Sequence, residues 1–71
     1  MADEKYGVRL ASDVSDRDGM GLELTDRRTG ETLAEVFQDD TNGVRTVTIF
    51  GDRALALADL EWFLRQASQR L

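Results

Sequence analysis

Residues 42–52 read NGVRTVTIFGD, and this stretch predicts where the sheet of the protein ends and its helix begins. Asn42-Gly43 is the dipeptide most typical of a tight β-hairpin turn. Threonine and branched apolar side chains follow over about 44–50, a composition that favours a β-strand. Gly51-Asp52 interrupts that strand, and Asp52 is a suitable N-cap. We therefore expect a fourth strand over about 44–50 and a helix over about 53–70.

Three further strands are expected before this stretch, over about 5–12, 20–27 and 31–38. Apolar and polar residues alternate cleanly in the first two, and turn-forming residues separate all three. Because every connection is short, the sheet should be an antiparallel meander. The sequence therefore predicts a single α+β domain over 1–71, a four-stranded antiparallel β-meander followed by one C-terminal α-helix packed on one face (ββββα).

The expected helix carries an apolar stripe at helical spacing. We expect this stripe to cover the apolar faces of the first two strands. Its residues are Leu57, Leu60, Phe63, Leu64, Ala67 and Leu71, and they should face Val8, Leu10, Leu22 and Leu24.

The third and fourth strands are apolar on both faces. Leu33 and Phe37 alternate with Ala34 and Val36, and the fourth strand shows the same double pattern. One helix covers only one face of a sheet. Either a second molecule covers part of the far face, or the sheet curls strongly, or a β-bulge reverses the side-chain alternation within a strand.

Composition restricts the class of protein. With 41% hydrophobic residues, the 71-residue chain is too apolar for disorder and is long enough for one small domain. The net charge of −5 argues against nonspecific binding to nucleic acid or anionic membranes. We see no signal peptide in the charged N-terminus, no apolar run of ~20 residues and no cysteine, so we expect a cytoplasmic protein.

Several chemistries lack their usual residues. The chain has no histidine and no cysteine, which removes the common general base, thiol catalysis and the usual zinc ligands. Asp16-x-Asp18-Gly19 has part of a calcium-loop pattern, but Val14 and Thr25 occupy the first and last ligand positions. We therefore expect no catalytic site, no metal and no cofactor.

Trp62 is the most conspicuous candidate for binding a partner. At 100° per residue it lies about 200° from Leu60, in the middle of the polar face of the expected helix. Leu55 and Ala58 lie beside it. An exposed tryptophan is a large apolar surface and is typical of an interface. The alternative is that Trp62 packs on loops of its own chain.

Acidic side chains suggest a second candidate surface. Asp13, Asp16, Asp18, Asp39 and Asp40 crowd two loops that should lie at the same end of an up-and-down sheet. In size and charge the chain resembles small acidic phage-encoded inhibitors such as anti-CRISPR proteins. That resemblance implies an acidic edge that binds a nucleic-acid-binding protein. The alternative is that turns simply favour aspartate.

A third reading comes from topology alone. A four-stranded meander followed by a helix resembles the fold of the whirly-type and transcriptional-coactivator single-strand DNA binders. The resemblance implies dimerisation through helices and DNA binding on basic, curved sheets. Here the arginines are interleaved with acids, so nucleic acid is an unlikely partner by charge. We favour a non-enzymatic protein-interaction domain that binds itself or another protein.

Overall fold

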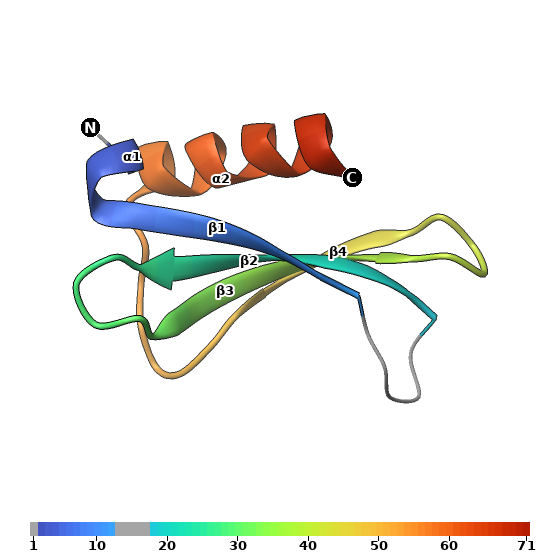
Figure 1. Cartoon of the computed structure of the whole chain (residues 1–71), viewed down its shortest axis with the longest axis horizontal. Coiled ribbons are helices and arrows are strands. Elements are labelled where there is room, and N and C mark those ends of the chain that lie inside the picture. The colour runs from blue at the N-terminus through green and yellow to red at the C-terminus, as the bar shows by residue number, and fades with distance from the viewer. Residues whose placement is uncertain (1, 13–17) are drawn as a thin grey trace.

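The computed structural model describes residues 2–12 and 18–71, and it confirms the predicted α+β order in this part of the chain. The sheet order is β1-β2-β3-β4 with all neighbours antiparallel, and α2 lies over one face (Figure 1). The short N-terminal helix α1 was not predicted. The elements are α1 (Ala2–Lys5), β1 (Tyr6–Ser12), β2 (Gly19–Asp26), β3 (Thr32–Asp39), β4 (Arg45–Ile49) and α2 (Leu57–Arg70).

Local hydrogen bonds explain the two described hairpin turns. In the β2–β3 turn, an oxygen of Asp26 accepts the backbone N–H groups of Arg28 and Thr29 at 2.7 and 3.2 Å. In the β3–β4 turn, Gly43 takes a φ of 73°, a value that glycine adopts without strain. The N–H of Asp39 donates to the carbonyl of Val44 at 3.0 Å, so the predicted hairpin at residues 42–43 is confirmed.

A β-bulge accounts for the double pattern of the third strand. Leu24 pairs with Ala34, whereas the next residue, Thr25, pairs with Thr32. Leu33 is therefore an extra residue on β3, and its side chain is buried in the same core as Ala34. Of the explanations that the sequence left open, the bulge is the one found in β3. It does not extend to β4, whose pairing with β3 is continuous.

Phe37 is buried on the face of the sheet that α2 does not cover. A Cβ atom built on Gly19 would come within 2.7 Å of the Phe37 ring, so this glycine leaves room for the phenyl ring beside the sheet. Gly21, the cross-strand partner of Phe37, instead accommodates the Glu35 carboxylate, which a Cβ atom would approach to 2.8 Å.

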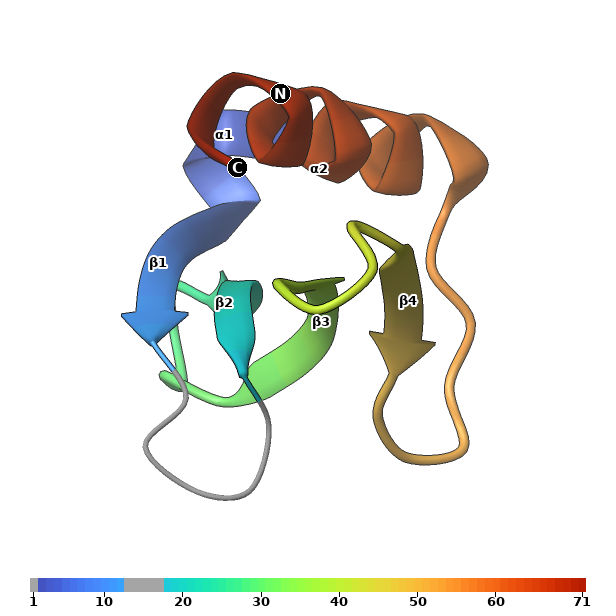
Figure 2. The ribbon, with the colours of Figure 1, turned by 90° about the vertical axis from the view of Figure 1, so that its right-hand side faces the viewer.

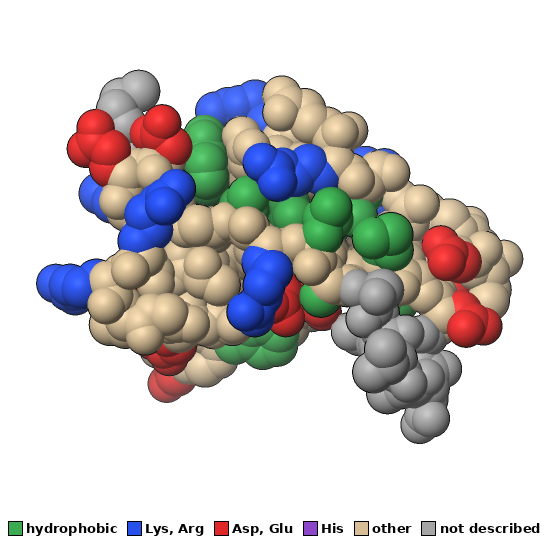
Figure 3. Space-filling view, in the orientation of Figure 1, with side chains coloured by type: hydrophobic (Ala, Val, Ile, Leu, Met, Phe, Trp, Pro, Cys, Tyr) green, Lys and Arg blue, Asp and Glu red, His purple; other side chains and the backbone are tan. Residues whose placement is uncertain are grey.

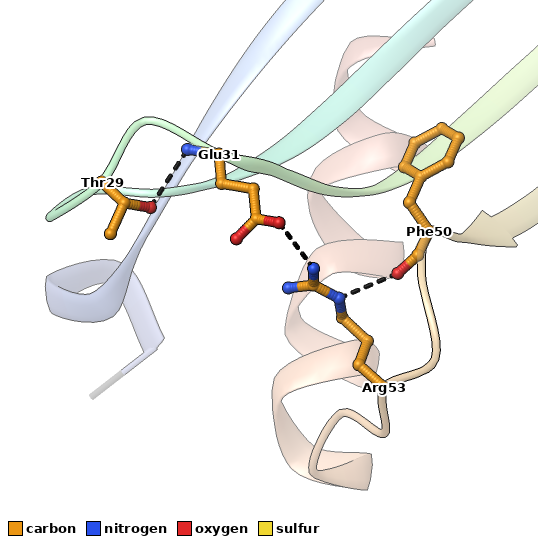
Figure 4. Close-up of polar contacts among 4 residues, drawn as sticks. All are labelled: Thr29, Glu31, Phe50 and Arg53. Atoms are coloured by element: carbon orange, nitrogen blue, oxygen red, sulfur yellow. Dashed lines mark hydrogen bonds and ion pairs between the residues drawn. The ribbon is translucent and has the colours of Figure 1, made fainter.

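The helix begins later than predicted, at Leu57, and Asp52 does not cap it. Ala56 occupies the N-cap position and makes no side-chain capping bond. Residues 50–56 instead form a connection held by Arg53, whose guanidinium donates to the Phe50 carbonyl at 2.8 Å and to the Glu31 carboxylate at 2.7 Å (Figure 4). This contact fastens the segment before α2 to the β2–β3 turn, where the Glu31 N–H also bonds the Thr29 hydroxyl.

The buried face of α2 differs from the predicted stripe. Phe63 and Ala67 are buried as expected, and Leu60 and Leu71 are partly buried against the core. Leu57 and Leu64 are exposed, at 69% and 37% of their surface, so their predicted packing on the first two strands is wrong. Leu10, the predicted partner on β1, is exposed as well.

The helix forms a layer above the sheet, with β1 and β4 on opposite sides of that view (Figure 2). It packs most extensively on β1 and β2, and Phe63 meets the fully buried Leu22 and Leu24 there. In the described part of the chain, neither helix has the length and apolar character needed to cross a membrane.

Candidate interaction surface

Trp62 packs on its own chain. Its ring centroid lies 6.4 Å from that of Tyr6 on β1, with 29° between the ring planes, and the side chain is half-buried against the core. The prediction of an exposed Trp62 face is therefore wrong. Of the two residues predicted to lie beside Trp62, Leu55 precedes α2 and is half-buried against the core, whereas Ala58 is in the helix and is exposed.

A part-buried hydrogen bond lies beside Trp62 and explains why this side of α2 is not a polar, solvent-facing side. The carboxylate of Asp59 accepts a 2.7 Å hydrogen bond from the Tyr6 hydroxyl. Trp62 and Asp59 therefore point together toward β1, on one side of α2. Hydrophobic side chains form a strip along the boundary between α2 and β1, with charged groups around it (Figure 3).

The Tyr6–Asp59 hydrogen bond should be detectable in the titration of the Tyr6 phenol. The hydrogen bond to Asp59, followed by burial and by the charges of Asp59 and Asp26, raises the pKa of Tyr6 from 10.0 to about 12. Tyr6 is the only tyrosine, so ultraviolet titration of its phenolate reports on it alone. We expect a midpoint near 12 in the folded protein and a shift toward 10 in Asp59→Asn.

The raised pKa of Tyr6 makes the free energy of unfolding depend on pH. Below pH 10 the phenol is neutral in both states, while between 10 and about 12 only the unfolded state ionises. The free energy of unfolding should therefore fall through this window. A midpoint near 10 while the circular dichroism is still native would contradict the Tyr6–Asp59 contact.

Acidic residues from the two predicted loops meet at Asp18 and Asp40. The N–H of Asp40 donates to the carbonyl of Asp18 at 2.8 Å, which places the residue before β2 beside the β3–β4 loop. Asp13 and Asp16 lie outside the described residues. Asp39 has a local role, because Thr41 donates to its carboxylate from the hydroxyl at 2.6 Å and from the N–H at 2.8 Å. These bonds lower the pKa of Asp39 and stabilise the turn.

Four arginines are held by partners within the chain: Arg9, Arg27, Arg45 and Arg53. Arg9 forms an ion pair with Glu23, its cross-strand neighbour. Arg45 donates to Gln38 at 2.7 Å, and Arg27 donates to a backbone carbonyl of α1 at 3.0 Å. With Arg53 bound to Glu31, these contacts spread the positive charges among acceptors over the surface. This arrangement does not favour a basic groove that tracks a phosphate backbone.

A hollow of about 480 Å³ lies where α1 meets the ends of β1 and β2. It carries charges of both signs, and among the described residues no cluster of three acidic side chains is placed to hold a metal ion. The hollow is lined by Glu4, Lys5, Tyr6, Asp26, Arg27 and Arg28.

Strand β4 is exposed along its whole length. It is the last strand in the sheet order, so its outer edge has no neighbouring strand among the described residues. Val47 pairs with Val36, and Ile49 pairs with Ala34, so both side chains lie on the face that carries the core. They are nevertheless 47% and 37% exposed. The helix leaves this part of its own side of the sheet uncovered.

The exposed leucines of α2 lie on the side of the helix toward β4. Trp62 precedes the buried Phe63 by one residue and points to β1, so Leu64, one residue later, points about 100° the other way. By the same helical geometry Leu57 lies on the Leu64 side. We call the exposed apolar set formed by Val47, Ile49, Leu57 and Leu64 the β4–α2 surface.

Comparison with protein-family models, with curated proteins and with solved structures finds no match for this chain.

Proposed function

We propose that the protein is a non-enzymatic protein-interaction domain that self-associates through the β4–α2 surface. The observation that carries this proposal is the exposure of Val47 and Ile49 on the sheet face that forms the core. Side chains on that face of an antiparallel sheet are ordinarily covered by the packed layer. A second protein surface would complete the covering that α2 begins.

The size of the surface supports an interface. Side chains at these exposed fractions leave roughly 300 Å² of apolar surface in total, about the size of the largest apolar patch on a typical monomer. Such a patch suits the central part of an interface that buries ~800 Å² on each partner. Burial of this apolar surface would also add stability to a domain with a small core.

The local charge supports self-association as well. The chain carries a net charge of −5, so two copies repel each other at long range. β4 contains no acidic residue, and its one charged side chain, Arg45, is bonded to Gln38. Two copies meeting at β4 therefore bring together strands that carry no acidic side chain.

Multi-angle light scattering of matched variants tests the proposal. We expect Val47→Glu to lower the mass of the wild-type assembly to that of the 8.0 kDa chain, because the carboxylate would be desolvated in the interface. Thr48→Glu adds the same charge to the same strand but on the opposite face, so it should retain much more of the association.

Both variants should keep the native circular dichroism, since Val47 and Thr48 are exposed in the single chain. Equal loss of mass in the two variants would contradict use of the β4–α2 surface. Equal retention of mass would contradict it too.

A further inference from the structure

We propose that the second copy pairs its β4 with β4 of the first copy, antiparallel and about a two-fold axis at Val47, to form one continuous eight-stranded sheet. This inference rests on the proposed self-association and adds its geometry. It follows from the direction of the free backbone groups, from the symmetry of the strand and from its composition.

Successive residues of β4 direct their backbone N–H and C=O groups toward opposite edges of the strand. The carbonyl of Val44 accepts from Asp39, and the N–H of Phe50 donates to Leu33 at 2.9 Å. Even-numbered residues therefore direct their N–H and C=O groups toward β3. In an antiparallel ladder the residues between them point the other way. The odd-numbered residues Arg45, Val47 and Ile49 thus present backbone donors and acceptors at the open edge, where no strand of the described chain pairs with them.

The strand is suited to pairing with itself. Val47 is the central residue of the five in β4. An antiparallel pair centred on it places Val47 opposite Val47 of the second copy and Arg45 opposite Ile49. The residues brought opposite one another are those whose backbone groups are free. Each can donate one hydrogen bond and accept one, so the whole open edge would be satisfied.

The side chains agree with this register. Odd-numbered residues of β4 lie on the α2 side of the sheet, so pairing would bring Val47 of the two copies into direct contact. Ile49 of each copy would lie beside the aliphatic part of Arg45 of the other. The exposed leucines of the two helices, Leu57 and Leu64, would line the same side of the joined sheet.

Nothing in β4 blocks such pairing. Edge strands in monomeric proteins are commonly protected by proline, lysine, a bulge or a covering segment. β4 reads RTVTI, contains neither proline nor lysine, and pairs with β3 without a register shift. The other edge strand of the sheet, β1, differs from β4 because both α1 and α2 contact it. We therefore assign the pairing to β4.

Single introduced cysteines test the register. The chain has no cysteine, so each variant can form one intermolecular disulfide. Directly opposed residues in a hydrogen-bonded antiparallel pair have Cα atoms ~5.5 Å apart, within disulfide range. We expect Val47→Cys to cross-link at least about tenfold faster than Thr48→Cys, which would face Thr46 rather than itself. Reducing agent should restore the monomer on denaturing gels.

Amide hydrogen exchange of the wild-type chain gives a readout that needs no variant. We expect the amides of Thr46 and Thr48 to be protected at every concentration, since they bond β3. The amides of Arg45, Val47 and Ile49 should be protected only when the protein is associated, and their protection should be lost on dilution.

The outcomes separate this inference from the proposed function. If the wild-type protein associates but Val47→Cys cross-links no faster than Thr48→Cys, and Val47 gains no protection, the strand pairing is wrong while self-association stands. If light scattering finds only the single chain at all concentrations, both proposals fail.

Discussion

Replacing Phe63 by alanine should lower the free energy of unfolding by about 3–5 kcal/mol, the usual range for removing a large buried aromatic side chain. Phe63 has no exposed surface and packs against Leu22 and Leu24, which are also fully buried. It is the central contact between α2 and the sheet. In a domain this small the loss is a large part of the total stability, and the variant is expected to be partly unfolded at 25 °C.

Leu57→Ala is the matched control on the same helix. Leu57 is 69% exposed in the single chain, so its truncation should change the free energy of unfolding by less than about 1 kcal/mol. Urea denaturation at low protein concentration measures both variants without the contribution of association. Similar destabilisation by the two substitutions would contradict the orientation of α2 described above.

Gly19→Ala is the second substitution expected to have a large effect, with a loss of about 1–3 kcal/mol of unfolding free energy. A Cβ atom at this position would lie 2.1 Å from the carbonyl oxygen of Gln38 and 2.7 Å from the Phe37 ring. The carbonyl belongs to the neighbouring strand, so relief of the clash requires the β2–β3 pairing to shift. The Phe37 ring would then lose part of its packing.

Gly7→Ala serves as its control in the same sheet. There the added Cβ would lie 2.9 Å from the Thr25 hydroxyl oxygen, which belongs to a side chain that can rotate. We expect this change to alter the unfolding free energy by less than about 1 kcal/mol. Thermal or urea denaturation compares the two variants. Equal stabilities would show that Phe37 and the Gln38 carbonyl are not packed against Gly19 as described.

The strands and turns could be predicted because their signals are local. The alternation of apolar residues in β1 and β2 depends on residues two apart, and the hairpin at residues 42–43 depends on one dipeptide. The bulge at Leu33 was foreseen only as one explanation among several. Its position depends on how β2 and β3 pair, which a single strand does not show.

The face of α2 could not be predicted from helical spacing alone. Phe63 and Leu64 are adjacent and both apolar, so the sequence does not say which of the two directs the packing. The choice depends on Tyr6, which is more than fifty residues away and binds Asp59 while stacking on Trp62. That contact turns the Trp62 side toward β1 and leaves Leu57 and Leu64 exposed.

The sequence did indicate uncovered apolar surface on the sheet, but it assigned that surface to both β3 and β4. Apolar residues on both faces of the third and fourth strands suggested a partner on the far face of the sheet. In β3 the bulge and the packing of Phe37 account for the pattern. In β4 they do not, and Val47 and Ile49 remain exposed on the same side as α2.

The most direct test is the molar mass of the wild-type protein in solution over a dilution series. Self-association through the β4–α2 surface predicts a mass close to twice 8.0 kDa at high concentration, falling to 8.0 kDa on dilution. Higher salt should favour the dimer, because screening reduces the repulsion between two chains of charge −5. A mass of 8.0 kDa at every concentration and salt would contradict it.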